Sequence, residues 1–288
     1  ASGFTFQDVA QATGLVWVDH HQALKNLVIN GMDGSLENPP VAVLKSVPDG
    51  LKPSMEFGFH AALKKYVLHT HSVYVNVVTC CTNCADLLKA IFPDTTYVLV
   101  PYVVPGHPLA SYIYQKQAKG EGAAIYFLKN HGVVIHADTA DEVLNLYHLV
   151  QQRITTYLNL TTPSALLPDV EIKQETKHIA FDSINQGLNR MEVADIQDRI
   201  LVPDQSIFFR DKVSDSDRSA AVYLDKEARR LTINGSYKFI AAAEGMLKMV
   251  YYIVSNHQRL QLNSEFISDK EQAILHGLSS EKYRVSIL

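Results

Sequence analysis

The apolar positions of the chain repeat with two periods, one typical of strands and one typical of helices. Runs rich in Val, Ile and aromatic residues predict strands, because β-branched and aromatic side chains suit a pleated, half-buried surface. Apolar residues three and four positions apart predict helices. In the first half we expect strands at 15–19, 41–44, 66–71, 97–104 and on both sides of 129–132, and helices at 54–63, 85–91, 108–119 and 139–160.

The second half reads as a smaller unit that mixes helices and strands. A segment with Thr, Pro and Ser at 161–165 is typical of a linker, so we divide the chain into domains 1–162 and 168–288 and call the latter the C-terminal unit. We expect in it a strand at 206–209, a hairpin at 221–233, a long apolar helix at 237–257 and a final helix at 268–278. Its histidines 178, 257 and 276 are scattered, and we interpret them as structural or surface residues.

The clearest chemical signal is a pair of histidines at the end of the expected strand 66–71. Residues two apart on a strand project from the same face, roughly 6–7 Å apart at the backbone, so His69 and His71 can converge on one metal ion while Thr70 turns away. A third imidazole, His131, lies in the sequence Lys-Asn-His-Gly between two β-prone runs, which predicts a hairpin turn. A lone histidine on a strand is usually a core residue, but this combination favours a metal site.

A carboxylate is expected to join the three histidines. Ser54 is expected to cap a short helix, which places Glu56 in its first turn. Three imidazoles with one open position suit Zn²⁺, which has no geometric preference from d-electrons. The residues alone therefore predict a zinc site at His69, His71 and His131, with Glu56 close to it.

The order of these motifs resembles the class II aldolase/adducin family. The resemblance rests on Glu-Phe-x-x-His from Glu56, His-Thr-His from His69, Pro-Tyr-Val-Val-Pro-Gly from Pro101 and Asn-His-Gly around His131, and it covers roughly residues 1–160. It implies a three-layer α/β/α domain with a mixed or antiparallel central sheet, followed here by a smaller α+β unit. It also implies a helix at 73–78, where β-branched residues alone would predict a strand.

The resemblance also assigns roles to single residues. In the family's aldolases the glutamate that matches Glu56 ligates the resting zinc and acts as general base, and the tyrosine that matches Tyr102 reaches in from a neighbouring subunit. This implies a homo-oligomer, often a tetramer, with its active site at the subunit interface. Ser2, Gly3 and Ser54 match parts of the family's anion site, but Met55 stands where the sugar-phosphate aldolases carry a second serine.

The implied activity is that of a zinc-dependent aldolase, a carbon–carbon lyase that cleaves a ketose or ketose phosphate through a metal-bound enediolate. The family's Gly- and Asn-rich phosphate loop does not precede Ser2 in this sequence, so a phosphorylated substrate stays open. Two alternatives also remain, a non-catalytic adducin-like assembly module and a 3-oxo acid phosphate decarboxylase. The family's epimerases carry aspartate in place of Glu56, and a Schiff-base mechanism would need a buried lysine, for which Lys129 is the one residue near the site.

Composition and charge restrict the partners. The 288 residues are 47% hydrophobic, which is ample for a core, and the net charge of −4 gives no electrostatic reason to expect a nucleic acid or a membrane surface as partner. We find no run long enough to span a membrane and no leader, and the clustered Cys80, Cys81 and Cys84 fit a reducing compartment. We therefore expect a cytoplasmic protein with a small-molecule substrate, and cysteines that pack as ordinary small residues.

Overall fold

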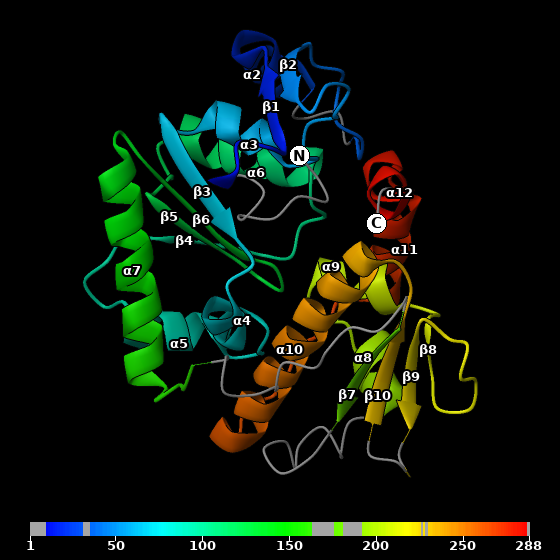
Figure 1. Ribbon diagram of the computed structural model, residues 1–288. Coiled ribbons are helices and arrows are strands. Elements are labelled where there is room, and N and C mark those ends of the chain that lie inside the picture. The colour runs from blue at the N-terminus through cyan, green and yellow to red at the C-terminus, as the bar shows by residue number, and fades with distance from the viewer. Residues whose placement is uncertain are drawn as a thin grey trace.

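The structure is a computed structural model that describes residues 10–30, 35–162, 176–180, 192–225, 227 and 230–286. Within these residues the chain forms two four-stranded sheets and a two-stranded ribbon. The first sheet and its helices lie on one side of the molecule, the second sheet lies on the other, and the long helix α10 (Tyr237–Leu260) runs between them (Figure 1).

The first sheet has the strand order β3-β6-β5-β4, with bounds Tyr66–Thr70, Gly132–Ala137, Ile125–Leu128 and Val98–Val100. β6 pairs antiparallel with both β3 and β5, whereas β4 pairs parallel with β5. The sheet is therefore mixed, as expected. β5 and β6 form the predicted hairpin, whose turn carries His131.

Alternate residues of this hairpin are buried on opposite faces of the sheet. Phe127 and Val133 pack in one apolar cluster, whereas Tyr126 and Val134 pack in another. Helices α4 (Val73–Thr79), α5 (Cys84–Ile91) and α7 (Ala140–Tyr157) cover the first face, and α2 (His20–Asn30), α3 (Phe57–Ala62) and α6 (His107–Ala118) cover the second (Figure 1). This is the expected three-layer α/β/α arrangement.

Two local predictions in this part have different outcomes. The β-branched residues of α4 form a helix, as the family resemblance implied, because Ser72 caps it by accepting a hydrogen bond from the Val75 backbone N–H. The prediction that Ser54 caps α3 is wrong. The Ser54 hydroxyl accepts from the Glu56 backbone N–H in a local turn, and the helix begins at Phe57 with Glu56 itself as N-cap residue.

Before the first sheet, a small ribbon pairs β1 (Leu15–Val18) with β2 (Val43–Val47) in antiparallel fashion. The helix expected at 139–160 is α7, and it begins with a capping box in which Thr139 and Glu142 accept hydrogen bonds from each other's backbone N–H groups. These elements frame the first sheet but bring no predicted metal ligand to it.

The C-terminal unit holds the second sheet, in the order β7-β10-β9-β8, and helices on both sides of α10 in the sequence. The strand bounds are Thr176–Ala180, Arg230–Asn234, Val222–Asp225 and Val213–Ser214; the helices are α8 (Val193–Gln197), α9 (Pro203–Phe209), α10, α11 (Asp269–Gly277) and α12 (Ser279–Ser286). α10 packs against α4, and one apolar cluster includes residues of both units. The two units therefore share a core; the proposed domain boundary near residue 163 adjoins residues outside the described ranges.

Two predictions in this unit need correction. The expected strand at 206–209 is a helix, α9, because Pro203 begins it without losing a hydrogen bond and the Gln205 side chain accepts from the Leu201 backbone N–H. Helix α11 is present with Ser268 as its cap, but it is not the final helix, since α12 follows. The hairpin β9–β10 and the long α10 agree with the sequence pattern.

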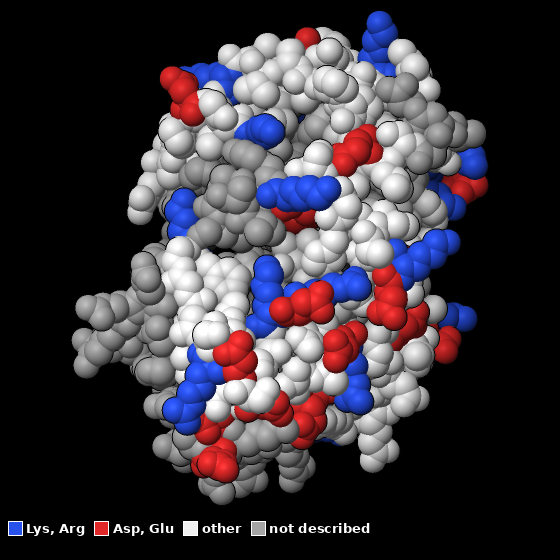
Figure 2. Space-filling view, turned by 90° about the vertical axis from the view of Figure 1, so that its right-hand side faces the viewer, with Lys and Arg blue, Asp and Glu red and all other residues white. Residues whose placement is uncertain are grey.

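Neither the surface charges nor the helices indicate a particular binding partner. On the face seen in Figure 2, basic and acidic side chains of the described residues are interspersed rather than gathered by sign. Among the described residues, no helix has both the length and the apolar character needed to cross a membrane.

Candidate metal centre

The two histidines of β3 point into the same site, as the strand geometry predicted. The Nε2 atoms of His69 and His71 are 3.1 Å apart. His69 is oriented by its own sheet, because its Nδ1 lies 3.0 Å from the backbone carbonyl oxygen of Val133 on β6. The rings of Phe59 and His69 also pack in a T-shaped contact, with centroids 5.4 Å apart.

His131 enters the site from the turn between β5 and β6. Its Nε2 lies 3.0 Å from the His71 Nε2, and its backbone carbonyl accepts a hydrogen bond from the buried Asn76. The neighbouring Gly132 is required by space, since a Cβ there would lie 2.2 Å from the Thr70 carbonyl oxygen. The turn residue Asn130 has φ of 53°, a left-handed conformation that asparagine adopts more readily than most residues.

Glu56 brings the carboxylate from the start of α3. Its two oxygens lie 3.2 Å from the His69 Nε2 and 3.3 Å from the His131 Nε2. The ligand atoms of Glu56, His69, His71 and His131 all lie within 4.8 Å of one another. The structure thus brings together the four residues that the sequence pattern selected.

The protonation states follow from burial and from the neighbours. Burial lowers the pKa of His131 to about 4, so its ring is neutral at neutral pH. Burial alone would raise the pKa of Glu56, but His69 and His131 next to its oxygens outweigh burial and hold this pKa well below the usual range. A neutral imidazole and an ionised carboxylate are the forms that ligate metal ions.

The donor set fits a cation. In the neutral form that ligates metals, an Nδ1 that faces a carbonyl or carboxylate oxygen carries the proton, which leaves a lone pair on the Nε2 of His69 and of His71. Lone pairs at 3.1 Å repel unless a positive charge lies between them. Tetrahedral zinc–nitrogen bonds would place such nitrogens about 3.3 Å apart, close to the observed spacing. The cluster is therefore a candidate metal-binding site.

One functional contact was not anticipated from the sequence. The Asp204 Oδ2 of α9 lies 3.1 Å from the His71 Nδ1, on the opposite side of the ring from the other ligands. The Pro-Asp pair at 203–204 is a helix-start signal, but nothing in the pattern indicates contact with a histidine 133 residues earlier. The C-terminal unit, in which the sequence analysis selected no site residue, thus contacts the cluster through Asp204.

Tyr102 does not bond to the histidine–glutamate cluster. It packs with Met55, Ile207 and Leu275 in a small apolar cluster, and its buried hydroxyl has no hydrogen-bond partner among the described residues. Burial, with the charges of Glu271 and Glu281 added, raises the pKa of Tyr102 well above its usual value. Its catalytic role stays a prediction.

The predicted anion-binding residues are only partly visible. Ser54 lies two residues before Glu56, and its hydroxyl accepts a hydrogen bond from the Glu56 backbone N–H. Ser2 and Gly3 lie outside the described residues. Their substrate role stays a prediction.

His257 and the three cysteines are packed in the interior of the protein. His257 is buried and bonded to the Val77 carbonyl and the Ser264 hydroxyl, and its burial lowers its pKa. Cys80, Cys81 and Cys84 are buried free thiols, and burial raises the pKa of each. They are packing residues rather than reactive ones.

Comparison with known proteins identifies the family. The sequence model described as "Class II Aldolase and Adducin N-terminal domain" matches residues 1–158, more than half of the chain. The chain belongs to the class II aldolase/adducin family. No curated protein matches it.

Two solved structures are similar in part. One is the N-terminal class II aldolase domain of a Thermoplasma acidophilum protein, with 22% identity, a TM-score of 0.41, and coverage of 50% of this chain and 67% of that one. The other is YgbL from Klebsiella pneumoniae, described as an aldolase, epimerase or decarboxylase without a choice among them, with 23% identity, a TM-score of 0.33, and coverage of 45% and 69%.

Proposed function

We propose that this chain is a zinc-dependent carbon–carbon lyase that cleaves a ketose or ketose phosphate into an aldehyde and a smaller ketone. The observation that carries the proposal is the convergence of three imidazole Nε2 atoms and the Glu56 carboxylate within 4.8 Å. Membership of the class II aldolase/adducin family supports a lyase-type reaction at such a site.

The ligand roles follow from the atoms that face each other. His69, His71 and His131 would hold the metal through Nε2, and Glu56 would complete its resting coordination. When bound, the metal supplies a Lewis acid that stabilises negative charge developing on the substrate oxygens.

Two protons must move during cleavage of an aldol bond. The bond between C3 and C4 breaks, its electron pair stays on the ketone fragment, and the C4 hydroxyl loses a proton as it becomes the aldehyde. In the direction of bond formation, the ionised Glu56 is placed to take the proton from the carbon of the ketone fragment, because its oxygens lie beside the His69 and His131 nitrogens, and cleavage returns that proton to the same carbon.

We assign the second proton to Tyr102, whose hydroxyl would donate it to the aldehyde oxygen in bond formation and take it back from the C4 hydroxyl in cleavage. The support is its match to the family's tyrosine, which serves the site of a neighbouring subunit. This assignment requires a homo-oligomer with each active site at a subunit interface. By analogy with the family, we propose a tetramer. Ser54, with Ser2 and Gly3, is proposed to bind the anionic or hydroxyl end of the substrate.

Metal content is the first test. Elemental analysis of the purified wild type should give about one zinc per chain, and the double variant His69→Ala/His71→Ala should give almost none. His148→Ala, which removes an exposed histidine of α7, is the control and should keep the metal. A wild type that stays metal-free after incubation with Zn²⁺ would contradict the lyase proposal and favour a non-catalytic assembly module.

A substrate panel then separates the reactions of the family. Aldehyde release from pentulose and hexulose phosphates, and from the unphosphorylated ketoses, tests aldol cleavage. Carbon dioxide release from 3-oxo acid phosphates tests the decarboxylase alternative. Zinc-dependent aldehyde release that disappears in His69→Ala/His71→Ala supports the proposal; carbon dioxide release alone would replace it with the decarboxylase.

A further inference from the structure

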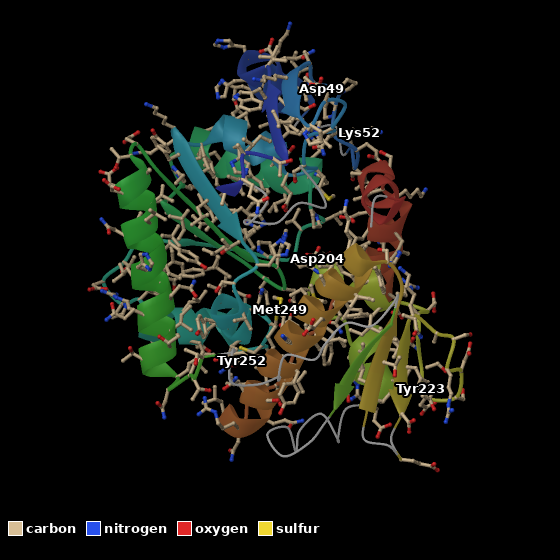
Figure 3. All side chains as sticks on the ribbon, viewed as in Figure 1. Asp49, Lys52, Asp204, Tyr223, Met249 and Tyr252 are labelled. Carbon is tan, nitrogen blue, oxygen red and sulfur yellow. The ribbon has the colours of Figure 1, made fainter. Side chains whose placement is uncertain are left out.

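Asp204 is a carboxylate of the C-terminal unit that faces a histidine of the first sheet. Its Oδ2 lies 3.1 Å from the His71 Nδ1, and the two side chains are 20% and 24% exposed. Figure 3 labels Asp204 where the end of β3 approaches α9 and the upper end of α10. Because the contact is largely shielded from water, its orienting effect on the ring is stronger than that of a surface ion pair.

We propose that Asp204 is a positioning residue of the metal centre, and that the C-terminal unit is therefore part of that centre. Asp204 holds the His71 ring so that its Nε2 faces the atoms of His69 and His131. The inference rests on the proposed function in one respect, because it takes the histidine–glutamate cluster to be a metal centre.

The position of His71 explains why it needs such support. β3 ends at Thr70, one residue before His71, so the pairing of β3 with β6 that brings the His69 ring to the Val133 carbonyl does not extend to His71. A carboxylate at Nδ1 fixes both the ring rotation and the tautomer, as carboxylates commonly do for metal-binding histidines. Asp204 lies on the far side of the ring, so it acts through His71 and not on the substrate.

Asp204 is itself held at a fixed point of the C-terminal unit. It follows Pro203 in the first turn of α9, and that turn is anchored by the Gln205 side chain, which accepts from the Leu201 backbone N–H at 2.8 Å. The same Gln205 amide donates to the Ile196 carbonyl at 2.9 Å, and the side chain is fully buried. The carboxylate is thus carried by a rigid element.

The segment just before Asp204 also supports the turn that carries His131. The Asn130 amide donates to the Leu201 carbonyl at 3.0 Å and to the Glu265 carbonyl at 2.7 Å. The neighbouring Lys129 forms an ion pair with Glu265. Residues 201–204 therefore support two of the three histidines: Asp204 contacts His71 directly, and Leu201 holds Asn130 in the turn that carries His131. These contacts couple the C-terminal unit to the geometry of the site.

Zinc affinity tests the inference without relying on activity. Competition with a chromogenic chelator should show that Asp204→Ala binds Zn²⁺ about 10–100-fold more weakly than the wild type. Asp204→Asn keeps the shape and an oxygen acceptor, so its loss should be smaller. Asp198→Asn, an exposed carboxylate at the end of α8, is the matched control and should bind as the wild type does.

Two further measurements separate positioning from a loss of folding. Urea unfolding of the metal-free proteins should leave the midpoint of Asp204→Asn close to that of the wild type. The visible absorption of bound Co²⁺, which depends on ligand geometry, should change in Asp204→Ala and less in Asp204→Asn.

The outcomes distinguish the two proposals. If the wild type binds Zn²⁺ and Asp204→Ala binds it equally well, the positioning role is overturned and the proposed function stands. If Asp204→Asn loses zinc affinity only to the extent that its metal-free form loses stability to urea, the contact is structural, and the positioning role is again overturned. If the wild type itself binds no Zn²⁺, the proposed function fails, and this inference fails with it.

Discussion

The two histidines of β3 face one centre, but different parts of the molecule hold them. His69 is supported by a backbone carbonyl of its own sheet, whereas His71 is supported by a carboxylate of the C-terminal unit. The first support comes with the strand register and would be present in any sequence that forms this sheet. The second exists only when the C-terminal unit is docked. In the metal centre that we propose, the first sheet would supply the histidine ligands, and the C-terminal unit would supply part of their orientation.

The largest expected effect would break the first of these supports. In Gly132→Ala the new Cβ would lie 2.2 Å from the Thr70 carbonyl oxygen and 3.1 Å from the His71 Cα. β3 must then move away from β6, which displaces both histidines. We expect loss of bound zinc and a fall in the free energy of unfolding of about 3 kcal/mol or more, measured by elemental analysis and urea unfolding.

A matched glycine in the C-terminal unit provides the control for that substitution. Gly245 lies within α10, and a Cβ there meets no atom within 4 Å. Gly245→Ala should therefore keep the zinc and stabilise the protein by about 0.5–1 kcal/mol, since alanine favours a helix interior. Equal behaviour of the two variants would contradict the steric account of Gly132.

The next largest effect is expected for Glu56, where a substitution should change the rate of the reaction without removing the metal. Glu56→Gln keeps the side-chain shape but removes the proton acceptor, while the three histidines remain. We expect zinc to be retained and the rate of aldol cleavage to fall by about 10²–10⁴-fold, measured by aldehyde release. Glu121→Gln changes an exposed glutamate paired with Lys116 and should leave the rate unchanged. An active Glu56→Gln enzyme would show that another group moves the proton.

These ligands could be foreseen because each depends on local order along the chain. The alternation of a strand puts His69 and His71 on one face, and a hairpin turn between two apolar runs carries His131. Asp204 could not be foreseen, because its contact with His71 depends on how two units pack, which no periodicity records. The apolar run at 206–209 was misread as a strand because Pro203 and Gln205, which start the helix, act from outside that run.

A smaller effect is expected at Asn130, which joins the turn carrying His131 to the C-terminal unit. Asn130→Gly keeps the left-handed backbone but removes the hydrogen bonds to the Leu201 and Glu265 carbonyls. We expect a loss of about 1–3 kcal/mol in unfolding free energy, together with weaker zinc binding by chelator competition. Asn159→Gly is the control, since Asn159 has φ of 48° and an exposed side chain. If both variants were neutral, the C-terminal unit would not support the His131 turn.

The smallest effect concerns pH and a second contact between the units. His257 of α10 is buried against α4, with its Nε2 2.8 Å from the Val77 carbonyl oxygen, and burial lowers its pKa below the usual 6.5. The unfolded chain therefore binds the proton more readily than the folded one. The contribution of His257 to stability is complete above about pH 6.5 and is lost as the pH falls toward the lowered value.

This sign can be checked by urea unfolding of the metal-free protein at pH 7.5 and pH 5.5. Wild type should be less stable at the lower pH, and His257→Gln, which does not titrate, should reduce that difference by at most about 1.4 kcal/mol per pH unit. His148→Gln, at an exposed position of α7, should leave the difference as it is in the wild type. If His257→Gln kept the full difference, protonation of His257 would not contribute to the pH dependence of stability, and the α10–α4 contact would be insensitive to pH.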